Sequence, residues 1–166
     1  RLHAAVQAVV PGVLDGHAAV HDGLDDDAVA LDGGHAAAAL RGLDGSLPQL
    51  VGGAFMDAEG DPTVLSGASL PEMGGSYRIG GQDNFIFEAC EYTDSFLSFL
   101  PTVAVVLNID RDHMEYFKTL DRLKQSFRTF AMSAKTAIIN GDDKNTRDAM
   151  EGITTPVITY GVGSSN

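Results

Sequence analysis

The chain has 166 residues, of which 44% are apolar, 20% charged and 7% aromatic, a composition typical of one soluble domain. Eleven Lys and Arg against 23 Asp and Glu give a formal charge of −12, which disfavours nucleic acid and anionic membranes as partners, because both need clustered cations. A single Cys excludes an internal disulfide and fits a cytoplasmic location. The sequence has no apolar run of membrane-spanning length and no leader pattern.

The first fifty residues differ in composition from the rest. They contain no Lys, Glu, Ile, Thr, Asn, Phe or Tyr, yet they hold four of the five histidines. We therefore divide the chain into an anomalous low-complexity segment, residues 1–50, and a domain, residues 51–166. The segment is expected to be poorly ordered or to be the out-of-frame translation of GC-rich DNA, although an Ala run favours a short helix over residues 35–41.

Two patterns in this segment partly match known ion sites. His17 and His21 are four residues apart, the spacing that places two zinc ligands on one helix face, but Gly16 and Gly23 flank them and no third ligand follows. The acidic stretch 22–32 lacks the central Gly and closing Glu of a calcium loop. Metal binding by the two histidines is therefore disfavoured, and a solvated acidic loop is the favoured interpretation of the acidic stretch.

From residue 51 onward the elements follow in chain order. A short strand is expected at 63–65, and the glycine-rich stretch 67–81 indicates a loop or hairpin. Buried strands are predicted at 85–89, 103–107, 136–140 and 156–160, with helices at 119–132 and 145–151. Continuous apolar strands that alternate with helices favour an α/β fold, a mostly parallel sheet flanked by helices.

Polar side chains gather where the predicted strands end, which is where ligands bind in α/β sheets. The three groups are Glu88 and Glu91; Asn108, Asp110, Asp112 and His113; and Asn140, Asp142 and Asp143. If the first two strands are near neighbours, Glu88 and His113 converge on one cation. A carboxylate and an imidazole beside a phosphate fit Mg²⁺ or Mn²⁺.

Simpler interpretations stay open for the same residues. Glu88 can cap a helix start, because carboxylates are favoured there. His113 can be an ordinary hydrogen-bonded surface residue, and Asp142 and Asp143 can serve only to form a turn.

Two stretches of the chain resemble the middle domain of the Mur ligase family. The first, residues 87–97, reads Phe-Glu-Ala-Cys-Glu-Tyr-Thr-Asp-Ser-Phe-Leu, and the second, residues 101–117, contains Asn-Ile-Asp-Arg-Asp-His at 108–113. Residues 61–81 and 140–143 also fit that family, so the resemblance runs from about residue 55 to residue 166. It implies an incomplete P-loop-type domain that binds ATP.

The resemblance also implies a reaction. The matching members join L-alanine to UDP-N-acetylmuramate through an acyl phosphate, with ATP and Mg²⁺ or Mn²⁺, in the cytoplasmic synthesis of peptidoglycan precursors. By residue-wise comparison, Glu88 and His113 would be the catalytic metal ligands, and Asn108 and Asp112 would shape the cofactor loop. The substrate would meet residues 74–78, with Gly75 and Arg78 as its contacts.

One departure from the family bears on activity. The family's Gly-Thr-His-Gly-Lys-Thr-Thr phosphate loop should fall near residues 40–46, which read Leu-Arg-Gly-Leu-Asp-Gly-Ser, and the first Lys of the chain is Lys118. We therefore expect a ligase fragment that is inactive alone. The alternatives are a non-catalytic α/β module with weak metal or nucleotide binding, and a related ligase with another acid substrate.

Overall fold

The computed structural model describes residues 60–70 and 74–162, together with residues 52 and 56 and the backbone of three short strands. These strands are β1 (Val6–Val10), β2 (Ala18–Ala19) and β3 (Ala30–Leu31). Three features of the first fifty residues lie outside the described residues, apart from the backbone within β2 and β3. They are the histidine pair at 17 and 21, the acidic stretch 22–32 and the short helix expected at 35–41. The expectation that residues 1–50 are poorly ordered or are an out-of-frame translation therefore stays a prediction.

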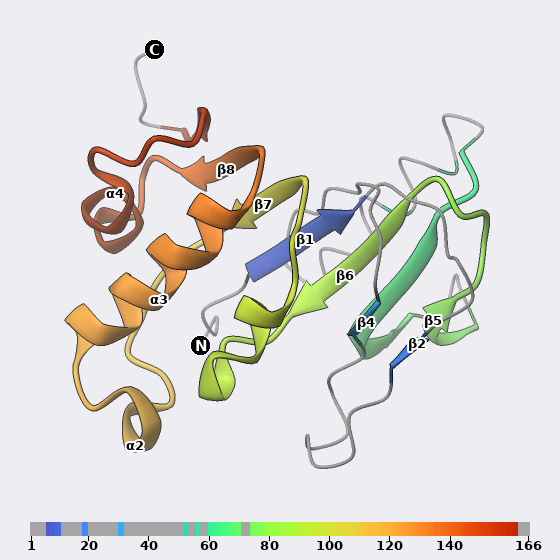
Figure 1. Cartoon of the computed structure of the whole chain (residues 1–166), viewed down its shortest axis with the longest axis horizontal. Helices are drawn as coiled ribbons and strands as arrows, with labels where there is room; N and C mark the ends of the chain where they lie inside the picture. Colours follow the sequence, from blue (N-terminus) through green and yellow to red (C-terminus); the bar gives the residue numbers. More distant parts are fainter. Residues whose placement is uncertain are drawn as a thin grey trace.

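Seven strands form one sheet in the order β5-β4-β6-β1-β7-β8-β9 (Figure 1). Besides β1, they are β4 (Thr63–Leu70), β5 (Gly75–Arg78), β6 (Phe85–Ala89), β7 (Val103–Val106), β8 (Thr136–Asn140) and β9 (Val157–Tyr160). β4 and β5 form an antiparallel hairpin, as the glycine-rich stretch suggested, although β4 is longer than the predicted strand. The predicted strands at 85–89 and 136–140 have the bounds of β6 and β8.

The direction of the strands decides where loops meet. β4 pairs with β6 in parallel, and β7, β8 and β9 are parallel to one another. β1, which the sequence did not predict, lies antiparallel between β6 and β7, so these two strands run in the same direction. The mostly parallel sheet is thus confirmed, with β5 and β1 as the strands that oppose it. Loops that leave β6 and β7 at their carboxyl ends start from the same edge.

Over residues 74–162, four helical segments lie between the strands. α3 (Leu120–Ser133) and α4 (Lys144–Met150) match the predicted helices to within about one residue at each end. Each begins at a side-chain cap, since Thr119 Oγ1 accepts a hydrogen bond from the Arg122 amide at 3.1 Å and Asp143 Oδ2 accepts one from the Thr146 amide at 2.7 Å. The 3₁₀ segment η2 (Tyr92–Ser98) and the one-turn helix α2 (Met114–Phe117) were not predicted. No helix in the described part of the chain is long and apolar enough to cross a membrane.

The core lies between α3 and the sheet, because α3 crosses one face over β7 and β8 (Figure 1). Its apolar stripe, Leu123, Phe127 and Phe130, is fully buried. Phe96 of η2 stacks on Phe130 with ring centroids 4.8 Å apart and meets the edge of Phe127 at 5.3 Å. These rings therefore fix η2 and α3 to each other as well as to the sheet.

A carboxylate adds a polar link between η2 and α3. Asp94 of η2 accepts hydrogen bonds from Ser126 and Arg122 of α3, and its side chain is 15% exposed. Partial burial acts to raise the pKa of Asp94, but the hydrogen bonds from Ser126, Tyr116 and Arg122 outweigh it and hold that pKa below its ordinary value of 3.8. Asp94 is thus ionised in the folded protein at neutral pH.

Truncation of Phe127 should destabilise the domain strongly. Phe127→Ala removes a fully buried ring from the centre of the core, and such changes cost about 3–5 kcal/mol of unfolding free energy. Met132→Ala, on the exposed side of the same helix, should change it by no more than about 0.5 kcal/mol. Urea unfolding followed by circular dichroism measures both, and similar midpoints for the two variants would contradict the assigned core.

The Asp94 contribution to stability should depend on pH. Because its pKa is lowered in the folded state, the contribution is complete above the unfolded value near 3.8 and is lost as the pH falls through the lower folded-state pKa. Asp94→Asn should cost about 2 kcal/mol at neutral pH and much less well below pH 3.8. Urea unfolding at both pH values measures this difference, with the exposed Glu151→Gln as control. A cost for Asp94→Asn that does not change with pH would disprove it.

Candidate functional site

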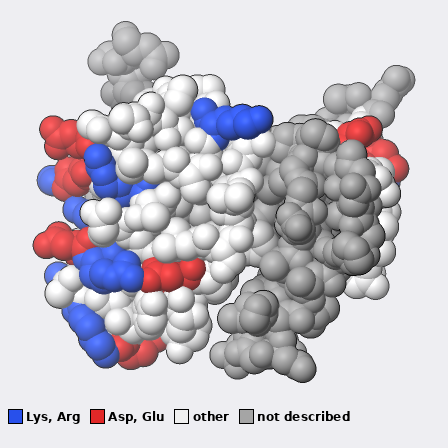
Figure 2. Space-filling view, viewed as in Figure 1, with Lys and Arg blue, Asp and Glu red and all other residues white. Residues whose placement is uncertain are grey.

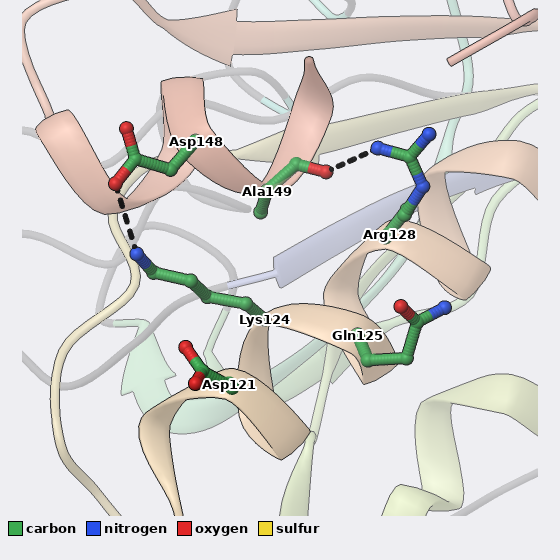
Figure 3. A pocket seen from close by; sticks show the side chains of 6 residues that line it. All are labelled: Asp121, Lys124, Gln125, Arg128, Asp148 and Ala149. Atoms are coloured by element: carbon green, nitrogen blue, oxygen red, sulfur yellow. Dashed lines mark hydrogen bonds and ion pairs between the residues drawn. The ribbon is translucent and has the colours of Figure 1, made fainter. Parts of the chain in front are cut away.

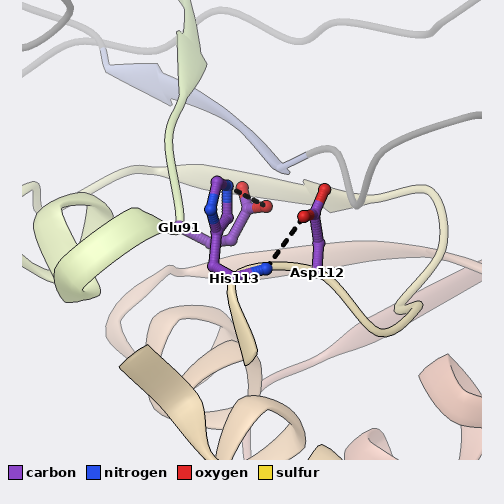
Figure 4. A group of neighbouring side chains, drawn as sticks. All are labelled: Glu91, Asp112 and His113. Atoms are coloured by element: carbon purple, nitrogen blue, oxygen red, sulfur yellow. Dashed lines mark hydrogen bonds and ion pairs between the residues drawn. The ribbon is translucent and has the colours of Figure 1, made fainter. Parts of the chain in front are cut away.

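The carboxyl ends of β6 and β7 bring together a cluster of three polar side chains. Glu91 lies between β6 and η2, whereas Asp112 and His113 lie in the loop between β7 and α2 (Figure 4). One potential ligand atom from each lies within 4.8 Å of those of the other two. The parallel course of β6 and β7 therefore joins groups that are more than twenty residues apart along the chain.

The contacts within the cluster place an imidazole between carboxylates. His113 Nε2 lies 3.8 Å from Glu91 Oε1, and His113 Nδ1 lies 3.5 Å from Glu115 Oε1. Asp112 Oδ1 accepts a hydrogen bond from the His113 amide at 2.8 Å. Glu91 is buried, whereas the His113 side chain is 33% exposed, so the cluster has a buried acidic side and an open side toward solvent. Such a concentration of negative charge favours a cation.

The His113 ring is also held by an aromatic neighbour. Tyr92, at the start of η2, places its ring centroid 4.7 Å from that of His113, at an interplanar angle of 45°. The His113 backbone has a φ of 49°, in the left-handed region, and it caps α2. Backbone strain of this kind is rare outside Gly and is maintained only where surrounding contacts require it.

The loop that carries His113 is anchored to the first turn of α4. Asp143 Oδ2 accepts a hydrogen bond from the Ile109 amide at 3.3 Å, and Asn145 Nδ2 donates one to the Ile109 carbonyl at 2.8 Å. Ile109 is 1% exposed, so both of its backbone groups depend on these partners to replace water. The polar residues after β8 therefore have a definite task, which is to hold the loop that follows β7.

Glu88, the glutamate predicted to meet His113, contacts β4 in the structure. Its Oε2 accepts a hydrogen bond from the Gly67 amide at 3.3 Å and lies 3.5 Å from Ser66 Oγ. The glutamate beside the His113 imidazole is Glu91, which the sequence placed at the same strand end without a ligand role. The convergence of Glu88 and His113 on one cation stays a prediction. The repeated Glu at 88 and 91 was the signal that could have offered both candidates.

The remaining predicted residues of these loops mostly shape the backbone. Asp110 Oδ1 accepts a hydrogen bond from the amide of the next residue at 2.7 Å, and Asn108 is half-buried at the start of the loop. After β8, Asn140 Oδ1 accepts one from the Asp142 amide at 2.9 Å, and Asp142 Oδ2 accepts one from the Val162 amide at 2.7 Å. The contact between Asn140 and the Asp142 amide fits a turn. Asp142 also binds the Val162 amide and Asp143 holds Ile109 and caps α4, so turn formation alone does not describe these two aspartates.

Arg78 and Gly75, the predicted substrate contacts, lie in the edge strand β5. The Arg78 guanidinium donates to Asp61 Oδ1 and to the Pro62 carbonyl, both at 2.5 Å. Gly75 pairs with Leu70 in the hairpin. In the strand order, β4, β6 and β1 separate β5 from β7, and the structure does not unite these two residues with the His113 cluster.

A hollow of about 240 Å³ lies between α3 and α4 (Figure 3). Most of its charged groups have partners within the chain: Asp148 Oδ2 accepts from Lys124 at 3.1 Å and from Lys144 at 2.6 Å. Arg128 donates to the Ala149 and Glu151 carbonyls. Lys and Arg alternate with Asp and Glu over this helical end of the molecule (Figure 2). The hollow is therefore better explained as a helix-to-helix contact than as a ligand site.

The chain is similar in sequence to curated ligases. It is 45% identical over 109 residues to the UDP-N-acetylmuramate–L-alanine ligase of Caldanaerobacter subterraneus subsp. tengcongensis. The aligned region covers 64% of this chain and 24% of the relative. It is 44% identical over 112 residues to the ligase of the same name from Caldicellulosiruptor bescii, covering 66% of this chain and 25% of that one. The chain thus spans about a quarter of the length of the curated relatives it matches.

Two solved structures share the fold. The UDP-N-acetylmuramate-alanine ligase of Thermotoga maritima superimposes with a TM-score of 0.61 at 21% identity, over 70% of this chain and 26% of that one. The UDP-N-acetylmuramate:L-alanyl-gamma-D-glutamyl-meso-diaminopimelate ligase of Neisseria meningitides superimposes with a TM-score of 0.60 at 23% identity. This match covers 72% of this chain and 45% of that one. A family model described as the Mur ligase middle domain matches residues 41–166. Because this match spans well over half of the chain, the protein belongs to the Mur ligase family.

Proposed function

We propose that this chain is part of an ATP-dependent ligase that joins L-alanine to UDP-N-acetylmuramate in the cytoplasmic synthesis of peptidoglycan precursors. The observation that supports this most is the cluster of Glu91, Asp112 and His113 at the strand ends of a chain 45% identical to a ligase of that name. A ligand site at this edge is what an open α/β sheet favours. The other substrates and domains of the reaction belong to the longer protein.

The reaction explains why a cation is needed. The substrate carboxylate and the ATP phosphates are all anions, and activation as an acyl phosphate brings them into contact before the amine of L-alanine attacks the acyl carbon. When bound, Mg²⁺ or Mn²⁺ neutralises this charge. The task of the chain's own residues is to hold such an ion beside the phosphates and to keep the loops around it in place.

The described donor set fits a divalent cation. Ligand atoms about 2.1 Å from one ion lie roughly 3–4 Å apart, and the three candidate atoms lie within 4.8 Å of one another. Small side-chain movements therefore suffice for all three to bind. Two carboxylates with one imidazole suit Mn²⁺ better than Mg²⁺, which makes Mn²⁺ the better probe.

The proposed roles follow from these positions. His113 binds the ion together with a glutamate, either Glu91 beside it or Glu88 after rearrangement of the strand end. Asp112 and Asn108 shape the loop around the cofactor phosphates. Arg78 is proposed to meet a substrate anion, which would have to compete with Asp61 for the guanidinium.

A second candidate function is a non-catalytic α/β module that binds metal or nucleotide weakly. The observation that favours it is the sequence Leu-Arg-Gly-Leu-Asp-Gly-Ser at residues 40–46, which lacks the phosphate-binding Lys of the family loop. These residues lie outside the part of the chain that the structure describes. Reading the genomic DNA around and upstream of this stretch in all three frames separates the two, because a Gly-Lys-Thr phosphate loop in any frame favours the ligase and its absence from every frame favours the module.

Loss of a ligand should weaken Mn²⁺ binding. His113→Ala and Glu91→Gln should each reduce the affinity for Mn²⁺ by about tenfold or more, because even the loss of a residue that only hydrogen-bonds to a metal ligand has an effect of that size. Electron paramagnetic resonance of free Mn²⁺ measures the affinity in the intact chain. Comparison with Glu88→Gln shows which of the two glutamates binds the ion. Asp148→Asn, which changes an acidic residue in the α3–α4 contact, is the control. A binding curve for His113→Ala that overlays the wild-type curve would refute the proposed site.

A further inference from the structure

Asp94 connects three elements around the His113 loop. Besides Ser126 and Arg122 of α3, it accepts a hydrogen bond from Tyr116 Oη of α2 at 2.8 Å. Thr93 and Asp94 both have left-handed backbone conformations, with φ of 54° and 62°, which kink η2 at this point. The contacts from α2 and α3 accompany this kink, because left-handed conformations of these residues need compensating contacts.

Tyr116 in turn fixes the backbone of His113. α2 has only four residues, and its Tyr116 and Phe117 amides both donate to the His113 carbonyl, at 2.9 and 3.0 Å. One turn of helix is not stable by itself in water, so its position depends on tertiary anchors. Its side-chain anchors include the buried Phe117 ring, Met114 packed against the core, and the hydrogen bond from Tyr116 to Asp94.

The same segment of η2 also contacts the His113 ring. Tyr92, two residues before Asp94, lies 4.7 Å from the imidazole and 6.3 Å from the Tyr116 ring, measured between centroids. η2 therefore holds α2 through Asp94 and holds the imidazole through Tyr92. A change in the first contact alters the second, and with it the distance from His113 to Glu91.

We propose that Asp94 is a positioning residue which, through its hydrogen bond to Tyr116, sets the place of α2 and keeps the His113 imidazole against Tyr92 and Glu91. The effect on cation binding rests on the proposed function, whereas the effect on the imidazole does not. Asp94 itself stands apart from the ligand cluster, since its hydrogen-bond donors are Ser126, Tyr116 and Arg122.

The positional effect is tested by NMR without metal. The ring protons of His113 should be shifted upfield by the Tyr92 ring, and His113→Gln assigns them among the five histidines. Tyr116→Phe, which removes only the hydroxyl, and Asp94→Asn, which tolerates the left-handed backbone, should both move these signals toward the values of unstructured histidine. Asp148→Asn should leave them unchanged. Wild-type His113 signals in a folded Tyr116→Phe protein would overturn the proposal.

The functional consequence is tested by Mn²⁺ affinity in the same proteins. Tyr116→Phe and Asp94→Asn should each weaken binding on the order of tenfold. The double variant should bind no more weakly than Asp94→Asn alone, because both changes act on the Tyr116–Asp94 hydrogen bond. If the wild-type chain fails to bind Mn²⁺, the proposed function fails while the NMR result still decides the positioning role. If it binds and Tyr116→Phe binds equally well, the positioning role is refuted and the metal site survives.

Discussion

The architecture depends on the burial of one face of α3. Leu123, Phe127 and Phe130 are removed from water against β7 and β8, and Phe96 brings η2 into the same core. Burial of side chains of this size provides about 1.5–3 kcal/mol each, which is large beside the net stability of a domain. β6 and β7 run in the same direction because each pairs antiparallel with β1, so the loops after them open at a single edge. The packing of α3 and η2 then holds the segments that follow these strands at that edge.

The site itself is assembled from short segments that cannot form alone. η2 provides Tyr92 and Asp94, the β7–α2 loop provides Asp112 and His113, and α4 holds that loop through Ile109. Four residues with positive φ lie in or next to η2 and α2. Their conformations are costly, and they persist because buried rings and charged hydrogen bonds determine where the chain must turn.

Membership of the Mur ligase family gives this edge a chemical context. In a ligase that brings anionic substrates together, a half-buried imidazole between carboxylates provides a place for positive charge. The chain spans about a quarter of the length of the curated relatives it matches, so the proposed cation site would be one component of a larger active site. Its geometry is nevertheless set within the described residues, by contacts between η2, α2, α3 and α4.

The sequence by itself determined most of the regular elements from β4 onward and the strand ends at which the polar side chains gather. The apolar runs of β6 and β8 and the helical period of α3 depend on local pattern, which a single sequence displays directly. Only the tertiary structure decided that Glu91 contacts His113, that Glu88 contacts β4, and that β1 lies antiparallel between β6 and β7. α2 and η2 also escaped prediction. These features depend on contacts between residues far apart in the chain and on left-handed backbone at non-glycine positions, and neither leaves a periodic signal in the sequence.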